Sequence, residues 1–259
     1  MFPSPRVSIV VPSYNQAPYL EAALTSVFDQ HYANIQLIVI DGGSTDGSLE
    51  IIQRHAARLA YWQSQPDAGQ TDAINQGFAR AEGKYLAWLN ADDRLLPEAV
   101  AEAVEFLEAH PAVGLVYGDA DFINGNGAVV GRFAARQTDY RRLLRGYVHV
   151  PQQAAFWRRS LWERVGPLDA EFYFAMDYDL WVRLAKVSEI RYHARRWAQF
   201  RLHGDSKTMR DDMRAWPEML KVQAREGGRW LSWIRLRYWA RRLLAPLLAL
   251  RWKRMLRDE

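Results

Sequence analysis

The sequence predicts an α/β fold in which helices cover both faces of a mostly parallel sheet, with a helical appendage at the C-terminal end. The first 120 residues alternate strand-like apolar runs with segments of helical spacing, which is typical of crossover units. Polar, turn-forming residues follow three of the predicted strands. The chain has 259 residues, of which 49% are hydrophobic and 25% charged, enough for one large α/β domain and an appendage.

In the first half, apolar runs predict the strands and periodic apolar residues predict the helices between them. The expected strands span residues 7–11, 35–40, 61–62, 85–89 and 113–117. The expected helices span residues 19–30, 48–59, 72–81 and 97–110. Pro97 stands in the first turn of its helix, where proline is tolerated.

The pattern changes after residue 120. Residues 124–127 read Asn-Gly-Asn-Gly, a strong turn signal between the apolar runs 120–123 and 128–130. Residues 133–150 are basic and predicted to be irregular. Further on we expect a strand at 154–157, helices at 161–165 and 179–186, and edge strands at 190–193 and 197–201.

The segment after residue 206 is rich in tryptophan and arginine and predicted to be helical from about Met209, with a break or kink at Pro246. The first 200 residues carry 19 basic and 23 acidic residues, a net −4, whereas the rest carries 15 and 7, a net +8. Such a tail can adsorb on an anionic membrane, or it can pack on the body or on a second subunit. Arg237 and Arg241 interrupt a simple apolar stripe, so the sequence favours shallow adsorption on a membrane. Nucleic acid is not the expected partner, because the acidic balance of the larger part argues against a nucleic-acid-binding body; nucleic-acid binding through the basic tail is a further alternative.

Cysteine is absent, which excludes disulfides and thiolate metal sites. The N-terminal residues lack the apolar core of a secretory signal, and the longest apolar run, 243–250, is too short to span a bilayer. We therefore expect a cytoplasmic protein, with a peripheral position on the inner face of the cell membrane left open.

Ligands of parallel α/β sheets bind at the carboxyl ends of the strands, and the polar residues of this chain fall at three such ends. The segments concerned are 12–15 (Pro-Ser-Tyr-Asn), 41–48 (Asp-Gly-Gly-Ser-Thr-Asp-Gly-Ser) and 90–93 (Asn-Ala-Asp-Asp). Taken singly, Asp41 and Ser48 are also suited to capping a turn and a helix. Together the three segments predict one shared crevice.

The sharpest element is the pair Asp92-Asp93 directly after an apolar strand. Two adjacent carboxylates repel each other and resist burial, and a divalent cation relieves both problems. Mg²⁺ typically uses one or two carboxylates together with substrate phosphates. The alternative is a solvated turn ahead of Pro97.

These motifs resemble the nucleotide-binding half of the family-two glycosyltransferases, which have the GT-A fold. The matching segments are 7–15, 41–48, 72–77 and 89–93, in family-like order and spacing. The resemblance extends weakly to residue 206. It implies a GT-A domain over residues 5–206, with a nucleotide-sugar-binding half (5–120) and an acceptor half (121–206), and leaves a basic tail over 207–259.

The resemblance also implies roles for single residues. Pro12, Tyr14 and Asp41 would line the base pocket, Asp92 would face the ribose or sugar, and Asp93 would hold Mg²⁺ or Mn²⁺ on the diphosphate. The assigned nucleotide-sugar-binding set is Pro12, Tyr14, Asn15, Asp41, Asp72 and Asp92. His203 resembles the late histidine that completes the metal shell in many GT-A enzymes, although a lone histidine is more often an ordinary loop residue.

The chain departs from the family pattern at two positions. The usual Asp-x-Asp appears as Asn90-Ala91-Asp92, so its first position lacks a charged ligand. Gln76 stands where many relatives have lysine. The first departure leaves the division of labour between Asp92 and Asp93 open.

Asp177, in the segment 174–181, resembles the catalytic base of the family, and the assignment goes to Asp177 and not to Asp179. A carboxylate that accepts the acceptor hydroxyl's proton is what an inverting transfer requires. The alternative for Asp177 is a helix N-cap. Gln152-Gln153 resembles a polar pair on the acceptor side, or else a pair of strand-edge amides.

The expected function is transfer of a sugar, with inversion, from a nucleotide-sugar to a hydroxyl of a saccharide or lipid-linked acceptor in cell-surface polysaccharide synthesis. A UDP-sugar is the expected donor and Mg²⁺ or Mn²⁺ the cofactor. A sugar-phosphate nucleotidyltransferase would need a glycine-rich basic loop after the first strand, which 12–15 does not provide. An inactive nucleotide-binding scaffold is the other alternative, and the four aspartates at 41, 92, 93 and 177 argue against it.

Overall fold

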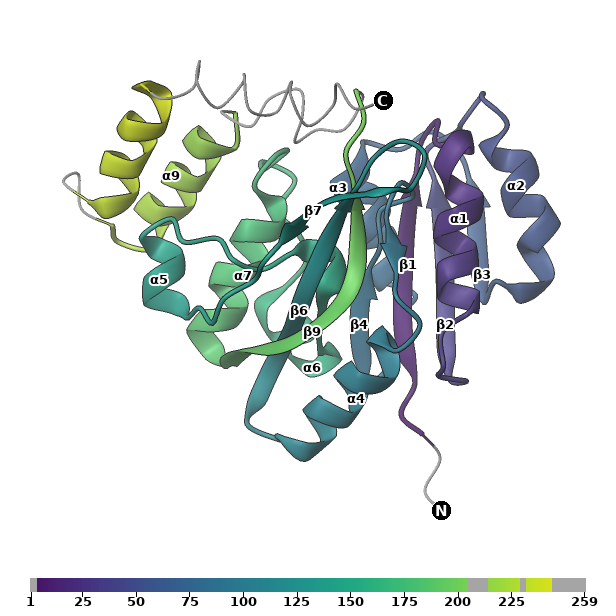
Figure 1. Ribbon diagram of the computed structural model, residues 1–259, viewed down its shortest axis with the longest axis horizontal. Helices are drawn as coiled ribbons and strands as arrows, with labels where there is room; N and C mark the ends of the chain where they lie inside the picture. Colours follow the sequence, from purple (N-terminus) through teal and green to yellow (C-terminus); the bar gives the residue numbers. More distant parts are fainter. Residues whose placement is uncertain (1–3, 205–213, 229–231, 244–259) are drawn as a thin grey trace.

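A computed structural model describes residues 4–204, 214–228 and 232–243 of the chain. Its strands form one nine-stranded sheet in the order β3-β2-β1-β4-β8-β6-β9-β5, with β7 paired to β6 (Figure 1). The strands are β1 (Val7–Ser13), β2 (Ile35–Asp41), β3 (Tyr61–Ser64), β4 (Tyr85–Trp88), β5 (Arg94–Leu95), β6 (Val113–Ile123), β7 (Val129–Phe133), β8 (Ala155–Arg158) and β9 (Glu189–Arg201). The predicted α/β class is confirmed.

The N-terminal half of the sheet is parallel. β1 pairs in parallel with β2 and β4, and β2 with β3. All seven residues of β1 are buried, as expected for a central strand covered on both faces. The register places Ser13 beside Asp41 and Asp41 beside Ser64, so these three strands end at the same edge.

The C-terminal half is mixed. β8 is antiparallel to β4 and β6, whereas β9 runs parallel to β6. The predicted turn at 124–127 is confirmed, since it joins β6 to β7 and Gly127 N donates to Asn124 O at 3.0 Å. The two expected edge strands at 190–193 and 197–201 are instead one strand, β9, because it pairs in parallel with β6 along its whole length, from Glu189 to Arg201.

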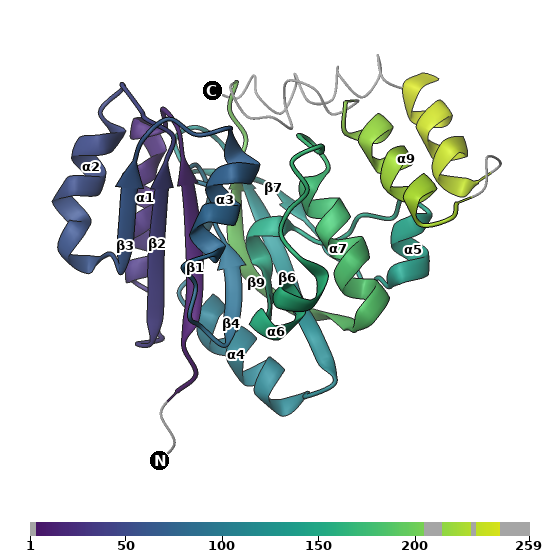
Figure 2. The same cartoon turned by 180° about the vertical axis from the view of Figure 1, so that it is seen from behind.

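Helices cover both faces of the sheet. α1 (Ala17–Phe28), α2 (Ser48–His55) and α4 (Ala99–Ala109) lie on one face, and α3 (Gln70–Phe78), α6 (Arg159–Val165) and α7 (Met176–Val187) on the other (Figures 1 and 2). Short helices occur at η1 (Ala56–Arg58), η2 (Gln152–Ala154) and α5 (Tyr140–Leu144). α5 falls within a segment that was expected to be irregular.

The start of the tail packs on the body. α9 (Ala215–Arg225) buries Trp216, Met219 and Val222 in the core cluster that also contains the α7 side chains. Residues 233–243 are helical, and Ile234 is fully buried in the same cluster. The packing alternative therefore holds for these parts of the tail, while Pro246 lies outside the described residues. Within the described parts of the chain, no helix is both long and apolar enough to span a bilayer.

Candidate active site

The loops after β1 and β2 are tied to each other. Asn15 adopts a left-handed backbone conformation with φ of 51°, and its Oδ1 accepts from Thr45 N at 2.9 Å. Its own backbone N donates to Ser44 Oγ at 2.8 Å. Asparagine tolerates this conformation better than most residues. Asn15 thus fixes the β1 loop on the β2 loop, at the edge where a donor is expected.

Asp41 ends β2 and is fully buried. Its Oδ2 accepts from Gly43 N, Ser44 N and Ser64 Oγ at 3.2, 2.9 and 2.7 Å, whereas its Oδ1 accepts from Ser44 Oγ alone at 2.5 Å. The Asp41 carboxylate therefore mainly stabilises the loop that follows β2. Of the other two residues expected at the base pocket, Pro12 is buried in β1 and Tyr14 is 63% exposed.

Two further aspartates lie at the start of α3. Asp72 Oδ2 accepts from Ala68 N at 3.1 Å and Gln76 Nε2 at 2.9 Å, so Gln76 binds within the helix. Asp67 lies against Gly42, where a Cβ would come 3.0 Å from Asp67 Oδ2. Burial, together with the charges of Asp72 and Asp41, raises the pKa of Asp67. The sequence prediction missed Asp67, although it too follows a strand of the parallel set.

The loop after β4 is held by a network of side-chain amides, of which Gln152 is buried and Asn90 and Gln70 are half-buried. Asn90 Nδ2 donates to Gln152 Oε1 at 3.1 Å and to Asp93 Oδ2 at 3.3 Å, and Asn90 Oδ1 accepts from Gln70 Nε2 at 2.8 Å. Gln152 Nε2 donates in turn to Trp88 O at 2.7 Å. Gln152, which was expected on the acceptor side, thereby reaches the loop of the aspartate pair.

Asp92 and Asp93 have different surroundings. Asp93 is 1% exposed, and its Oδ1 accepts from Arg201 N at 2.9 Å. Burial, followed by the neighbouring Asp92 charge, raises the pKa of Asp93 well above its ordinary value. Asp92 Oδ2 instead lies 3.0 Å from His203 Nε2, with side-chain exposures of 18% and 9%. The His203 ring packs on Tyr19 with centroids 4.7 Å apart.

Arg201 is a site residue that the sequence prediction missed. It ends β9, is 1% exposed, and its Nε donates to Asp92 O at 2.8 Å. Its Nη1 donates to Asn124 O and Gly125 O at 2.9 Å each, and its guanidinium lies 4.7 Å from the Tyr19 ring centroid. One buried arginine therefore joins the aspartate loop to the β6–β7 turn. Arginine is common on surfaces, so its type alone gave no signal of this role.

The Asp92–His203 pair suits a divalent cation only if other ligands join it. Across residues 4–204, 214–228 and 232–243, no three acidic or histidine side chains come together as a metal site. A carboxylate and an imidazole are nevertheless compatible donors, and a metal bound to a diphosphate takes its remaining ligands from phosphate oxygens and water. The residues present therefore fit a metal that arrives with a nucleotide-sugar.

Asp177 lies in the first turn of α7 and is half-buried. The N-cap of α7 is Ala175, so the capping alternative for Asp177 does not describe this helix, although Asp177 Oδ1 accepts from Tyr178 N at 2.7 Å. Asp179 is fully buried and paired with Arg183 and Arg225. These two ion pairs hold the Asp179 carboxylate inside the protein.

The tail supplies a carboxylate that binds backbone N–H groups at the amino end of α7. Glu218 of α9 accepts from Phe174 N at 2.7 Å and Ala175 N at 2.8 Å. A carboxylate at the amino end of a helix satisfies unpaired N–H groups and interacts favourably with the helix dipole. Glu218 is thus a capping residue supplied by a distant segment, which a search for local caps cannot find.

Contacts at the start of α3 join the two halves of the domain. Gln70 reaches Asn90, and the next residue, Thr71, places its Oγ1 3.0 Å from Met176 Sδ. Asn75 makes a double hydrogen bond with the backbone of Leu168, at 2.9 Å in each direction. The aspartate loop and the first turn of α7 therefore both contact the start of α3.

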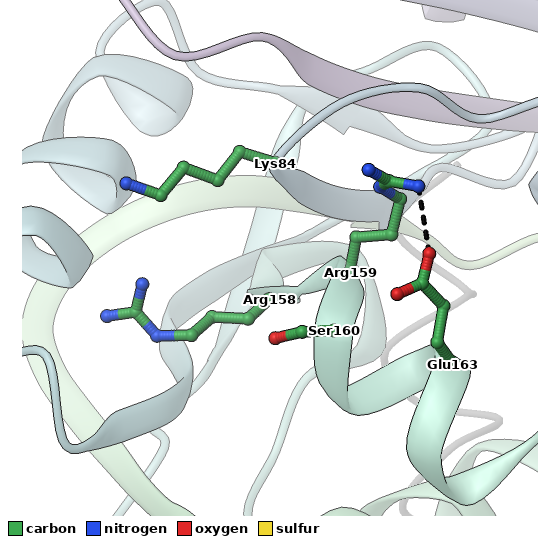
Figure 3. Close-up of a pocket in the computed structure, with 5 residues that line it drawn as sticks. All are labelled: Lys84, Arg158, Arg159, Ser160 and Glu163. Atoms are coloured by element: carbon green, nitrogen blue, oxygen red, sulfur yellow. Dashed lines mark hydrogen bonds and ion pairs between the residues drawn. The ribbon is translucent and has the colours of Figure 1, made fainter.

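A shallow hollow lies elsewhere, where β8 leads into α6, lined by Lys84, Arg158, Arg159, Ser160 and Glu163 (Figure 3). Its cations are bound to protein groups: Lys84 to Glu108, Arg159 to Glu163, and Arg158 to backbone carbonyls that include Val113 O. The hollow therefore offers little to an anionic ligand and is not the candidate site.

Comparison with known proteins agrees with this geometry. Residues 8–165 match the family "Glycosyl transferase family 2". An uncharacterized glycosyltransferase of Mycobacterium tuberculosis is 38% identical over 192 residues, which cover 73% of this chain and 72% of that protein. A "PGL/p-HBAD biosynthesis glycosyltransferase" of Mycobacterium bovis is 32% identical over 184 residues, 70% of each chain.

Solved structures show the same fold. TarS of S. aureus in complex with UDP-GlcNAc superposes with a TM-score of 0.67 at 16% identity, over 84% of this chain and 66% of TarS. The mannosyltransferase PcManGT of Pyrobaculum calidifontis, in complex with GDP-Man and Mn²⁺, gives a TM-score of 0.65 at 21% identity, over 85% and 65%. This chain thus spans about two thirds of each. The fold and site define a GT-A glycosyltransferase. The chain belongs to glycosyl transferase family 2.

Proposed function

We propose that this glycosyltransferase moves one sugar, with inversion, from a nucleotide-sugar to a hydroxyl of a saccharide or lipid-linked acceptor. The observation that carries the proposal is the arrangement around the start of α3. Gln70 holds the loop that contains Asp92, and Thr71 contacts the residue before Asp177. A direct displacement requires a donor-binding carboxylate and a base held near each other, and both of these segments contact the same helix end.

The donor would bind along the ends of β1, β2 and β4. Among the described residues, Asp41 Oδ1 has a single hydrogen-bond partner, which supports its assignment to the imide of a pyrimidine base. Pro12, Tyr14 and Asn15 would lie around the base, and Asp72 at the helix end. A UDP-sugar is the donor we infer. TarS is known in complex with UDP-GlcNAc, whereas PcManGT is known with GDP-Man, so both nucleotides belong in the test.

We assign the Mg²⁺ or Mn²⁺ contact to Asp92 and His203, whose Oδ2 and Nε2 atoms are 3.0 Å apart. Asp93 was the carboxylate expected at the metal, but its bonds to Arg201 and Asn90 suit a supporting role behind Asp92. The bound metal would neutralise the charge that develops on the leaving diphosphate. The Mn²⁺ complex of PcManGT supports a divalent cation in this fold.

Asp177 would accept the proton of the acceptor hydroxyl. As that oxygen bonds to the anomeric carbon, the bond from the anomeric carbon to the diphosphate oxygen breaks, and the diphosphate leaves with its electron pair. Such base catalysis contributes about 10² to 10⁴-fold. The burial of Asp179 in two ion pairs argues against Asp179 for this step, so we keep the assignment to Asp177.

We place the reaction in synthesis of cell-surface polysaccharide or glycolipid, at the inner face of the cell membrane. The relative named for PGL/p-HBAD biosynthesis supports a cell-envelope acceptor. The basic tail, with its net +8, supports a position near anionic lipid.

A donor panel tests the proposal. Purified full-length protein is incubated with UDP- and GDP-sugars, with Mn²⁺ or with chelator, and its melting temperature is recorded. Because a ligand of the native state raises stability, one nucleotide-sugar should raise the melting temperature in the presence of metal. Release of nucleoside diphosphate from that donor should then require Asp177. Absence of any donor-induced shift would contradict the proposed function.

A further inference from the structure

One face of the helix at residues 233–243 presents large apolar side chains to solvent. Trp233, Leu236, Trp239 and Leu243 are 63, 59, 57 and 81% exposed. At about 100° per residue these four positions fall within an arc of about 120°. We call these four side chains the outer face. The helix lies at the edge of the molecule in both views, as the yellow helix beside α9 (Figures 1 and 2).

The opposite side of this helix is held on the body, which fixes where the outer face points. Ile234 is fully buried against Gly146, at which a Cβ would come 3.0 Å from Ile234 Cγ1. The Arg237 guanidinium lies 4.1 Å from the Tyr147 ring centroid. Tyr238 packs against Trp216 of α9 with centroids 6.3 Å apart. The exposed side chains therefore belong to a docked helix and lie on the side turned away from the body.

The helix that carries the outer face has charge of one sign. Residues 232–243 contain four arginines and no acidic residue. The Arg242 guanidinium lies 5.4 Å from the Trp239 ring centroid, at the margin of the outer face. Tryptophan favours the interface of a bilayer, and arginine favours the phosphates of anionic headgroups.

We propose that the outer face docks on an anionic lipid bilayer. Trp233, Leu236, Trp239 and Leu243 would enter the boundary between headgroups and acyl chains, and Arg242 at their margin would bind lipid phosphate, as in other interfacial helices. From sequence spacing alone, Arg237 and Arg241 interrupt the apolar stripe of this helix. The sequence does not show which side of the helix packs on the body, and the structure does. The proposal goes beyond the transfer reaction and does not depend on the identity of the donor.

The test uses the full-length protein and vesicles of defined composition. Co-sedimentation is measured with vesicles of phosphatidylglycerol and phosphatidylcholine and with vesicles of phosphatidylcholine alone, at low and at high salt. We expect binding to the anionic vesicles, weakened at least fivefold by high salt, and little binding to the neutral ones. Screening of the arginine–phosphate attraction is the reason for the salt effect.

Variants assign the binding to the outer face. The double variant Leu236→Ser/Trp239→Ser should bind anionic vesicles at least tenfold more weakly than the wild type. Val129→Ser removes an apolar side chain that is 59% exposed on β7, and it should bind as the wild type does. Arg242→Gln should weaken binding severalfold, whereas Arg164→Gln, an exposed arginine on α6, should not. Unchanged melting temperatures show that the substituted proteins are folded.

Three results would overturn the proposal. The first is wild-type protein that stays in solution with anionic vesicles, and the second is a double variant that sediments as the wild type does. The third is a concentration-dependent dimer, seen by analytical ultracentrifugation, that the double variant abolishes while vesicle binding persists, because a second copy would then cover the outer face. Retention on nucleic acid that exceeds retention on vesicles and requires Leu236 and Trp239 would overturn it as well.

Discussion

Glu218 offers the most direct test of how the tail affects the site. It is the only capping carboxylate seen at the start of α7 within the described residues, and it binds the two backbone N–H groups that precede the turn of Asp177. Replacing it by alanine leaves the rest of α9 in place. We expect Glu218→Ala to keep its fold and its affinity for the donor while losing turnover.

The magnitude follows from the two hydrogen bonds, of 2.7 and 2.8 Å. Loss of a helix N-cap typically costs about 0.5–2 kcal/mol, and a bond to a charged group contributes about 1.5–3 kcal/mol. Water can replace part of this at a half-buried position, so we expect the free energy of unfolding to fall by about 1–2 kcal/mol. If loss of the two hydrogen bonds also makes the first turn of α7 mobile, the activation free energy of the transfer should rise by about 1.4 kcal/mol. Such a rise lowers kcat about tenfold.

The assay is steady-state kinetics of the proposed transfer, combined with urea unfolding. Glu218→Gln should lie between the wild type and Glu218→Ala, because its amide oxygen still accepts a hydrogen bond but carries no charge. Lys221→Ala on the same helix is the control, because its ion pair with Glu171 is exposed on both sides and contributes little. If Glu218→Ala loses stability but keeps kcat, the cap supports the fold without positioning the base.

The remaining predictions concern the site directly. Asp177→Asn should lower kcat about 10² to 10⁴-fold with unchanged donor affinity in calorimetry. Asp179→Asn should instead lower the free energy of unfolding by about 1.5–3 kcal/mol, because a fully buried side chain loses its charge-assisted bonds to Arg183 and Arg225. Calorimetry should also show donor binding that Mn²⁺ strengthens in the wild type but not in Asp92→Ala or His203→Ala; equal binding with chelator would contradict the metal assignment. Asn75→Ala should cost about 1–3 kcal/mol in urea unfolding, because the backbone of Leu168 loses both partners.

Local patterns were sufficient to predict the parallel half of the sheet. Strands such as 35–40 are continuous apolar runs, and the helices between them repeat their apolar residues at helical spacing, so each element is recognisable from its own residues. The rule that ligands meet at the carboxyl ends of parallel strands then selected the loops at 41–48 and 90–93. The turn at 124–127 was predictable for the same reason, because asparagine and glycine determine its backbone.

The features that local patterns could not predict depend on residues far apart in the chain. Arg201 reaches Asp92 across 109 positions, and Glu218 reaches Phe174 across 44. Neither residue type indicates burial by itself. β9 was expected as two strands, and its continuous pairing with β6, a strand about 75 positions earlier in the chain, makes it one. Asp67 is different, since it follows β3 and the rule applied to the other loops would have selected it.

The neutral residue at position 90 is consistent with the burial of Asp93. Asn90 Nδ2 lies 3.3 Å from Asp93 Oδ2, and its Oδ1 accepts from Gln70. An aspartate at position 90 would put a second negative charge beside a carboxylate that is 1% exposed, and it would remove the donor to Gln152. An asparagine instead donates to Asp93 and Gln152 and still binds the start of α3. The departure from Asp-x-Asp therefore stabilises the loop that contains Asp92, and under the proposed metal assignment Asp92 would be the charged ligand beside His203.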